Sequence, residues 1–245
     1  MKDIELWQGD CLELMKDIPD ASVDMILCDL PYGTTKNKWD SIIDLDKLWE
    51  QYERVIKERG VVVLTAIQPF TSMLITSNPK LYKYNWIYQK NQGIDPMMAK
   101  IRPLNNYEDV VVFYKRKPTY NPQMTYVGVK DKRTTFQDVE VFDENKGSFV
   151  YKRPKKDSGW RYPKRVITFK VERGLHPTQK PVALFEYLIK TYTNEGETVL
   201  DNCMGSGTTG VACKNLGRKF IGIELDENYF NLAKERIESV EGLNE

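Results

Sequence analysis

Two stretches of the chain combine residue types that could do chemistry. The first is "CDLPYG", residues 28–33, which places a carboxylate, a proline and an aromatic ring directly after the apolar run VDMIL. The second is "DNCMGSGTTG", residues 201–210, a glycine-rich loop. A carboxylate beside an aromatic ring can bind and stack on a planar base, and glycines let a backbone approach a ligand closely. The sequence therefore predicts two ligand-contacting loops.

The glycine loop has the surroundings of a nucleoside site. A predicted strand at 198–201 precedes it, a predicted helix follows, and the next predicted strand ends at Glu224, seventeen residues beyond Gly207. An acid in that place can accept hydrogen bonds from two ribose hydroxyls. The pattern of glycines by itself also fits an NAD-binding protein or a simple tight turn.

The first loop suits an exocyclic amine such as adenine N6. The Asp29 carboxylate and the Leu30 carbonyl could accept its two hydrogens, which favours the tetrahedral nitrogen that attacks an electrophile. Pro31 stiffens the backbone and Tyr32 offers a ring for stacking. The structural alternatives are a turn or helix cap for Asp29 and an amphipathic rim position for Tyr32.

The elements that must position these loops alternate between apolar runs and amphipathic stretches, which is typical of parallel strands joined by helices. We expect strands at 5–8, 23–28, 61–65, 85–89, 110–114, 198–201 and 220–224. We expect helices at 44–60 (closed by Gly60), 182–192, 208–216 and 227–240 (capped by Asp226). Strand ends of such a sheet share one edge, so both loops should face one crevice.

Composition narrows the class of protein. No stretch approaches the length of a membrane span, and the polar start MKDIELWQGD lacks the apolar run of a secretion signal, so we expect a soluble, cytoplasmic protein. Four cysteines without a CxxC pair and a single histidine indicate reduced thiols and no metal site.

Charge is unevenly distributed along the chain. Residues 115–175 hold 16 Lys/Arg against 7 Asp/Glu, whereas the net charge of the whole chain is +1. Prolines interrupt this segment and aromatic residues are mixed with its cations, which suits contact with phosphates and bases. The plain alternative is a solvated lysine-rich surface. We predict DNA contacts from Lys36, Lys38, Lys152, Arg153, Lys155, Lys156, Trp160, Arg161, Lys164 and Arg165.

Together, the two motifs resemble those of the S-adenosylmethionine-dependent DNA amino-methyltransferases, which act on adenine N6 or cytosine N4. The order of motifs, with the catalytic motif first, the cofactor loop last and a basic insertion between, resembles the beta group. Leu30 stands where that family usually has proline. The role expected of Leu30 belongs to its backbone carbonyl, which does not require proline.

The resemblance implies roles for further residues. Asp201, Gly205 and Gly207 would border the methionine part of the cofactor, and Glu224 would bind the ribose. "QGDCLEL" would bind the adenine through Asp10 and Cys11, although Asp10 also fits a helix N-cap. "HPTQKP" would place Thr178, Gln179 and Lys180 near the methionine carboxylate.

We therefore expect a doubly wound, mostly parallel α/β sheet of the Rossmann-like methyltransferase fold. Its catalytic half would span 1–114, an inserted target-recognition region 115–175 and the cofactor-binding half 176–245. The expected activity is methylation of adenine N6 in double-stranded DNA after base flipping. Alternatives are a cytosine N4 methyltransferase, an RNA or protein-amide methyltransferase and an NAD-linked oxidoreductase. By resemblance, a bacterial or phage origin, a restriction-modification setting and a homodimer are expected.

Overall fold

The computed structural model describes residues 3–33, 42–94, 96–128, 138–143, 147–152, 159–172 and 179–240, with little beyond the backbone for the strands at 138–152. The chain forms two compact units. One comprises residues 1–121 and 165–245, and the other comprises residues 122–164. The larger unit holds every element that surrounds the two ligand-contacting loops.

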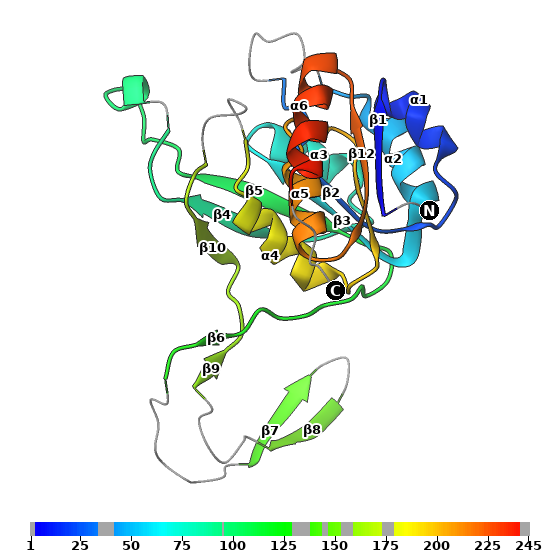
Figure 1. Ribbon diagram of the computed structural model, residues 1–245. Helices are drawn as coiled ribbons and strands as arrows, with labels where there is room; N and C mark the ends of the chain where they lie inside the picture. Colours follow the sequence, from blue (N-terminus) through cyan, green and yellow to red (C-terminus); the bar gives the residue numbers. More distant parts are fainter. Residues whose placement is uncertain are drawn as a thin grey trace. The chain divides into compact units, whose positions relative to one another are not determined.

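An eight-stranded mixed sheet forms the centre of the larger unit (Figure 1). Its strands, in spatial order, are β1 (Ile4–Gln8), β12 (Lys219–Glu224), β11 (Thr198–Asp201), β2 (Val23–Cys28), β3 (Ile56–Ala66), β5 (Tyr107–Phe113), β4 (Tyr82–Lys90) and β10 (Val166–Phe169). The first five are parallel, β5 is antiparallel to both neighbours, and β10 is parallel to β4. The predicted doubly wound, mostly parallel sheet is confirmed.

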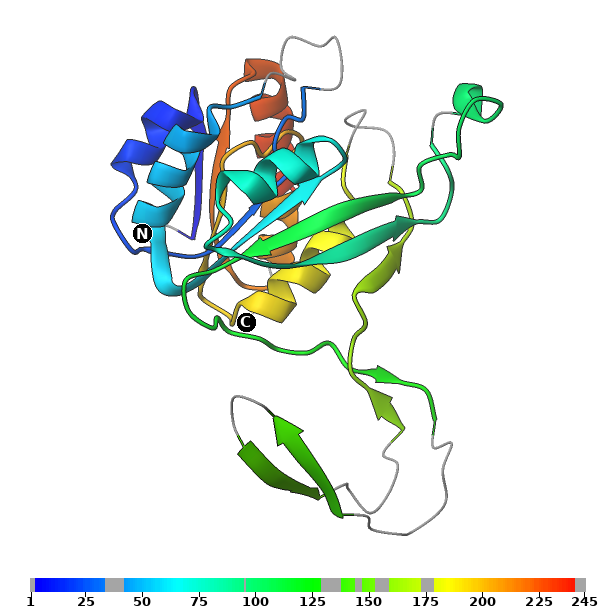
Figure 2. The same ribbon diagram turned by 180° about the vertical axis from the view of Figure 1, so that it is seen from behind.

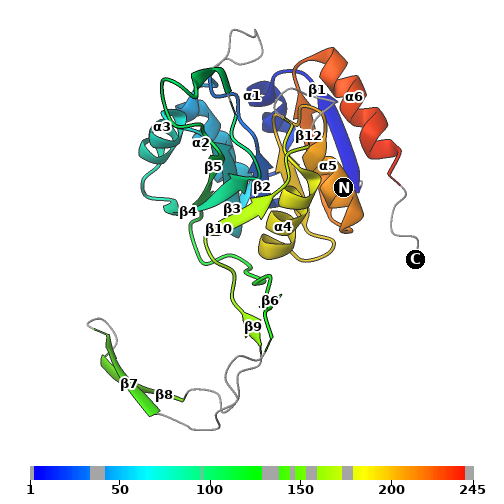
Figure 3. The same cartoon turned by 90° about the vertical axis from the view of Figure 1, so that its left-hand side faces the viewer.

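Helices cover both faces of the sheet (Figures 2 and 3). One face packs against α1 (Cys11–Leu14), α2 (Leu45–Val55) and α3 (Phe70–Ser77), and the other against α4 (Val182–Tyr192), α5 (Thr208–Asn215) and α6 (Glu227–Glu238). Short 3-10 turns lie at Met15–Asp17 and Pro96–Met98. Because both faces are buried, the central strands are nearly continuous apolar runs.

The predicted helix at 44–60 is wrong at its C-terminal end. Helix α2 stops at Val55, and Ile56 begins β3, whose residues pair with β2. Gly60 therefore lies inside a strand and does not close the helix. A Cβ at this position would meet the Ile56 side chain at 2.6 Å and the Asp24 carbonyl at 3.0 Å, so close packing explains the glycine. Sheet pairing overrides the local helical periodicity here.

The smaller unit consists of two antiparallel strand pairs, β6 (Thr125–Tyr126) with β9 (Trp160–Arg161) and β7 (Asp138–Asp143) with β8 (Gly147–Lys152). At residues 122–164, this unit spans fewer residues than the insertion at 115–175 predicted from composition. Residues 115–121 and 165–172 belong to the larger unit. The second of these segments contains strand β10, a strand that the sequence did not predict.

Candidate active site

The Asp-Leu-Pro-Tyr segment leaves the end of β2 in the middle of the sheet. Cys28 is the last residue of that strand and is fully buried, and the Leu30 side chain is only 3% exposed. These two anchors hold Asp29, Pro31 and Tyr32 at the carboxyl edge of the sheet. The predicted position of this loop, directly after a buried strand, is the observed one.

Three donors surround the carboxylate of Asp29. The Tyr32 hydroxyl donates to Asp29 Oδ1 at 2.5 Å, and the Thr65 hydroxyl donates to the same oxygen. The Lys180 ammonium lies 2.6 Å from Asp29 Oδ2. Charge-assisted hydrogen bonds of this kind are strong and directional, so the carboxylate is held in one orientation.

Lys180 is the most buried charged group at this site. Its side chain is 5% exposed, and besides Asp29 it lies 3.2 Å from Glu108 Oε2, while Lys90 lies 2.6 Å from Glu108 Oε1. Burial by itself would lower the pKa of Lys180, but the two carboxylates outweigh it and raise the pKa above its ordinary value. The ammonium therefore stays charged.

The Lys180 side chain binds Asp29 and Glu108, because a buried cation requires anionic partners. Its place near the methionine carboxylate stays a prediction from the resemblance. Sequence reasoning missed Thr65, Glu108 and Lys90, which lie on strands distant in sequence from Asp29 and from one another. Only the pairing of β3, β5 and β4 brings them together.

The ring of Tyr32 lies between apolar and cationic neighbours. Its centroid is 5.5 Å from that of Phe70, and Lys180 Nζ lies 5.6 Å from it. Burial, followed by the charge of Asp29, raises the pKa of Tyr32, so its hydroxyl remains a proton donor. The half-buried ring is thus fixed at its hydroxyl end and supported on one side.

A cavity of about 210 Å³ lies beside this loop. Asp10, Cys11 and Glu224 line it, as do Pro31 of the Asp-Leu-Pro-Tyr segment and neighbouring residues Gly9, Leu12, Ile43, Asp44, Asn202, Cys203 and Leu225. Three predicted cofactor residues and one predicted catalytic residue therefore share a cavity. Strands β1, β12 and β2 bring them to the same edge of the sheet.

The glycine loop shapes one wall of this region. Gly205 and Gly207 have φ values of +50° and +76°, in the left-handed region that favours glycine. The Gly205 N–H donates to Glu224 Oε2 at 2.8 Å, and the Asp226 N–H donates to Glu224 Oε1 at 2.9 Å. Burial raises the pKa of Glu224 against the effect of these donors. The carboxylate is oriented and keeps acceptor capacity for ligand hydroxyls.

Asp201 is a buried carboxyl behind the loop. Its oxygens accept hydrogen bonds from the Thr209 hydroxyl and, at 3.1 Å, from the Cys203 N–H. Burial raises its pKa to about 7 in spite of these donors. Asp201 therefore joins the strand β11 to the first turn of α5, with the glycine loop between them.

Asp10 caps α1, as the alternative interpretation held. Asp10 Oδ1 accepts from the backbone N–H groups of Leu12 at 2.8 Å and Glu13 at 3.3 Å. The residue also lines the cavity, so capping and ligand contact are compatible. Cys11 lines the same wall; a hydrogen bond with Cys203 and burial raise the pKa of its thiol, which stays neutral.

Gln179 presents a buried acceptor in the segment before α4. Its Nε2 donates to Glu172 at 3.3 Å, and no group among the described residues donates to its Oε1. An ammonium group of a ligand is a suitable partner for such an atom. Thr178 lies outside the described residues.

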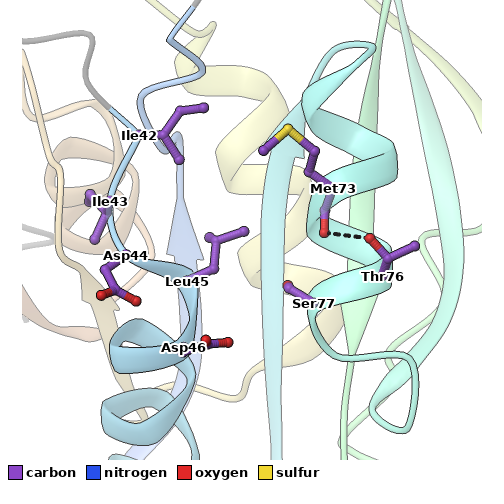
Figure 4. A pocket seen from close by; sticks show the side chains of 8 residues that line it. All are labelled: Ile42, Ile43, Asp44, Leu45, Asp46, Met73, Thr76 and Ser77. Carbon is purple, nitrogen blue, oxygen red and sulfur yellow. Dashed lines mark hydrogen bonds between the residues drawn. The ribbon is translucent and has the colours of Figure 1, made fainter.

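An open groove of about 460 Å³ adjoins the cavity, with which it shares Ile43 and Asp44 (Figure 4). Leu45 and Asp46 continue its α2 side, and Met73, Thr76 and Ser77 of α3 form the opposite side. Its lining offers few converging polar groups beyond the carboxylates of Asp44 and Asp46. The cavity, with its oriented acid and open glycine loop, is the better nucleoside site.

The predicted DNA-binding residues are divided between the two units and the undescribed segments. Trp160 and Arg161 of β9, with the exposed Lys164, belong to the smaller unit, whereas Arg165 belongs to the larger one, 5.7 Å from the ring of Tyr84. Trp160 is 50% exposed and its ring lies 5.3 Å from that of Tyr126. Only the backbone of Lys152 is described, and Lys36, Lys38, Arg153, Lys155 and Lys156 lie outside the described residues.

Two aromatic residues of β4 lie in the core of the sheet. Trp86 and Tyr88 are 4% and 1% exposed and belong to the core. Within the described part of the chain there is no group of side chains that could hold a metal ion. No helix in those same ranges is long and apolar enough to cross a membrane.

The comparison with known protein families agrees with this geometry. The N6/N4 methyltransferase family model, described as "DNA methylase", matches residues 23–235, from β2 into α6. The chain belongs to the N6/N4 DNA methylase family. It is therefore a DNA methyltransferase, and its cofactor is S-adenosylmethionine. This decides between the two cofactors that the glycine pattern left open and excludes the NAD-linked alternative.

Two relatives of this methylase cover most of its length. It is 30% identical to DNA adenine methyltransferase YhdJ of Escherichia coli (strain K12), with 94% of the chain and 81% of the relative aligned. It is 29% identical to Type II methyltransferase M.HpaI of Haemophilus parainfluenzae, with 97% and 75% aligned.

Solved structures share the fold of the methylase. The crystal structure of an M1.HpyAVI-SAM complex has a TM-score of 0.67 at 28% identity, covering 96% of this chain and 98% of that one. The PvuII DNA methyltransferase, described as cytosine-N4-specific, has a TM-score of 0.68 at 15% identity, covering 99% and 88%. At that identity the second likeness concerns the fold alone.

Proposed function

We propose that this DNA methyltransferase transfers a methyl group to the N6 amine of adenine in double-stranded DNA. One observation carries the proposal. A single edge of the sheet holds the oriented carboxylate of Asp29, the ring of Tyr32 and the cavity proposed for the cofactor. Two observations favour adenine over cytosine. The Asp-Leu-Pro-Tyr segment begins with an aspartate, and the chain is similar to an adenine methyltransferase.

The residues of the cavity fit S-adenosylmethionine. Glu224 would accept the ribose hydroxyls, Asp10 and Cys11 would border the adenine, and the open space at Gly205 would leave room for the methionine part. Gln179 Oε1, to which no described residue donates a hydrogen bond, suits the amino group. When bound, the cofactor supplies an activated methyl group on its sulfonium.

The chain's own groups would act on the amine. Asp29 and the Leu30 carbonyl would accept its two hydrogens and favour a tetrahedral nitrogen, whose lone pair is no longer conjugated with the ring and can attack. Tyr32 would stack on the base and hold it in line, which is the positioning that makes such a transfer fast. As the nitrogen–methyl bond forms, the bond between that methyl group and the sulfonium sulfur breaks and leaves a thioether. The nitrogen loses one proton, to Asp29 or to water.

The target base must leave the duplex to reach Asp29. Unstacking costs a few kcal/mol, which stacking on Tyr32 and pocket contacts would offset. We propose that the basic residues of 115–175 bind the flanking DNA, and that Trp160 contributes base contact. By resemblance we also propose a homodimer, which light scattering on the purified protein would test.

The experiment is a product analysis. The purified protein is incubated with duplex DNA and S-adenosylmethionine, and the DNA is digested and analysed by mass spectrometry. We expect N6-methyladenine. Finding N4-methylcytosine alone would overturn the choice of base, and methylation of RNA or protein in parallel reactions, with none of DNA, would overturn the choice of substrate.

A further inference from the structure

A chain of four charged groups of alternating sign runs through the catalytic edge of the larger unit. Its members are Asp29, Lys180, Glu108 and Lys90, joined by contacts of 2.6, 3.2 and 2.6 Å. Their side chains are 24%, 5%, 7% and 11% exposed, so only Asp29 is accessible to solvent to a useful degree. The charges balance, and the accessible end is the proposed catalytic carboxylate.

The four groups come from four separate parts of the fold. Asp29 follows β2, Lys180 precedes α4, Glu108 lies on β5 and Lys90 ends β4. The hydroxyl of Thr208, at the start of α5, donates to the Lys180 carbonyl at 3.4 Å. Lys180 therefore contacts the helix of the glycine loop through its backbone and the catalytic carboxylate through its side chain.

We propose that Glu108 is a positioning residue for methyl transfer, which holds the Lys180 ammonium against Asp29 and thereby fixes the orientation of the catalytic carboxylate. This inference rests on the proposed function of Asp29. It deepens that function by assigning roles to two residues, Glu108 and Lys90, that do not touch the cavity or the Tyr32 ring.

A purely stabilising role explains the arrangement poorly. Three buried charges and a partly buried fourth cost much desolvation energy, and apolar residues of similar volume often give equal or greater stability. Such a network is useful where one of its members must keep a defined geometry. Lys180 has two carboxylate partners among the described residues, and its ion pair with Glu108 is a restraint on the ammonium in addition to its contact with Asp29.

The electrostatics of Lys180 agree with this role. The ionisable groups that face it are Asp29, Glu108, Tyr32 and Tyr88, with Lys90 behind Glu108. Burial lowers the pKa of Lys180, and the two carboxylates raise it to a greater extent. Without Glu108, one of these two opposing charges is lost, and the pKa of Lys180 falls.

The central experiment compares Glu108→Gln with wild type. We expect kcat to fall by about 10- to 100-fold, because a small displacement of a reacting group has an effect of this size. The dissociation constants for S-adenosylmethionine and for DNA should change less than about threefold, since Glu108 is buried and does not line the cavity. Glu186→Gln, a part-buried change on α4 where Glu186 binds Asn215, serves as the matched control and should leave kcat unchanged.

The double variant Glu108→Gln/Lys90→Met separates positioning from charge compensation. It removes the lysine that Glu108→Gln leaves buried without its partner. If Glu108 serves only to neutralise Lys90, the double variant recovers kcat, and the proposal is overturned. If Glu108 acts on Asp29 through Lys180, kcat remains low although thermal stability recovers.

A second readout does not depend on the reaction. NMR titration of the Lys180 ammonium should give a lower pKa in Glu108→Gln than in wild type, and crystal structures of the two should differ in the Asp29 side chain. An unchanged Asp29 orientation would overturn the positioning role even if the wild-type enzyme proved inactive on DNA. The product analysis of wild type, carried out separately, reports failure of the proposed function itself.

Discussion

At the scale of single residues, the environment of Asp29 decides what this site can do. Among the described residues, Tyr32, Thr65 and Lys180 donate to its two oxygens, so the carboxylate is held in one orientation before any ligand arrives. A carboxylate has about four acceptor sites, which leaves capacity for one amine hydrogen. The site is therefore preorganised for hydrogen-bond acceptance, and its interaction should strengthen as the amine becomes tetrahedral.

The first prediction concerns Asp29→Ala. We expect kcat to fall by about 100- to 1,000-fold or more, as for other groups that act in the transition state. The affinity for S-adenosylmethionine, measured by calorimetry, should stay nearly unchanged because Asp29 does not line the cofactor cavity. Asp20→Ala, at a 76% exposed position, is the control. Normal turnover of Asp29→Ala would refute the assigned role.

The second prediction concerns the pH dependence of stability through Asp201. Its pKa in the folded state is about 7, above the ordinary value of 3.8, so folding favours the protonated carboxyl. Its stabilising contribution is complete below pH 4 and is lost as pH rises towards 7, at up to about 1.4 kcal/mol per pH unit. Asp201→Asn cannot ionise and should lack this loss.

Urea denaturation at several pH values from 4 to 8 measures this difference. The free energy of unfolding of wild type, relative to Asp201→Asn, should decrease with rising pH over that range. A difference that is constant with pH would show that Asp201 titrates normally in the folded protein.

At the scale of elements, the turn between β11 and α5 shows how a backbone conformation can serve a ligand. Gly205 and Gly207 both have positive φ, but their surroundings differ. A Cβ at Gly207 would meet Ala233 of α6 at 3.0 Å, whereas a Cβ at Gly205 would meet nothing within 4 Å. Gly207 is thus required for helix packing, and the space at Gly205 is open for a ligand.

The third prediction compares Gly205→Ala with Gly217→Ala. Both positions have positive φ, and neither Cβ would meet a neighbour, so both variants should lose about 1 kcal/mol of stability. Only Gly205→Ala should weaken binding of S-adenosylmethionine, by about tenfold or more, since its methyl group would enter ligand space. Calorimetry and thermal melting measure the two effects. Equal cofactor affinity in both variants would remove Gly205 from the binding site.

At the scale of the whole molecule, the excess of basic residues and the residues of the candidate active site lie in different parts of the chain. The cofactor cavity and Asp29 belong to the larger unit, while the excess of Lys/Arg lies in residues 115–175, which contain the smaller unit. A polyanion that binds to such cations releases counterions, so its affinity falls steeply with salt. This division agrees with a scaffold for catalysis and a separate element for DNA recognition.

The fourth prediction concerns Lys164→Gln in the smaller unit. We expect weaker DNA binding and a salt slope reduced by about one, as for the loss of a single phosphate contact. Lys234→Gln, which removes an exposed lysine of α6, is the matched control and should leave the slope unchanged. Fluorescence anisotropy at several salt concentrations gives both slopes. A slope for Lys164→Gln equal to that of wild type would count against phosphate contact.

Much of the fold followed from local patterns. Strands β2 and β11 and helix α4 have the predicted bounds, because uninterrupted apolar runs and amphipathic periodicity have few other solutions in a sheet buried on both faces. The Asp-Leu-Pro-Tyr turn and the glycine loop were predictable because proline and glycine destabilise the interior of helices and strands. Asp226 was predictable as the cap of α6 by its place before an amphipathic run.

What the tertiary structure decided was pairing between distant segments. Strand β3 begins at Ile56 because this residue pairs with Val23 of β2, and no pattern within residues 56–60 shows that neighbour. Thr65, Glu108 and Lys90 joined the site because β5 is antiparallel to β3 and β4, which brings the start of one strand to the ends of the others. The sequence by itself determined the two motifs and their chemistry. The contact of Lys180 with Asp29 depended on the sheet, because a buried ammonium lies where the fold supplies its counter-charges.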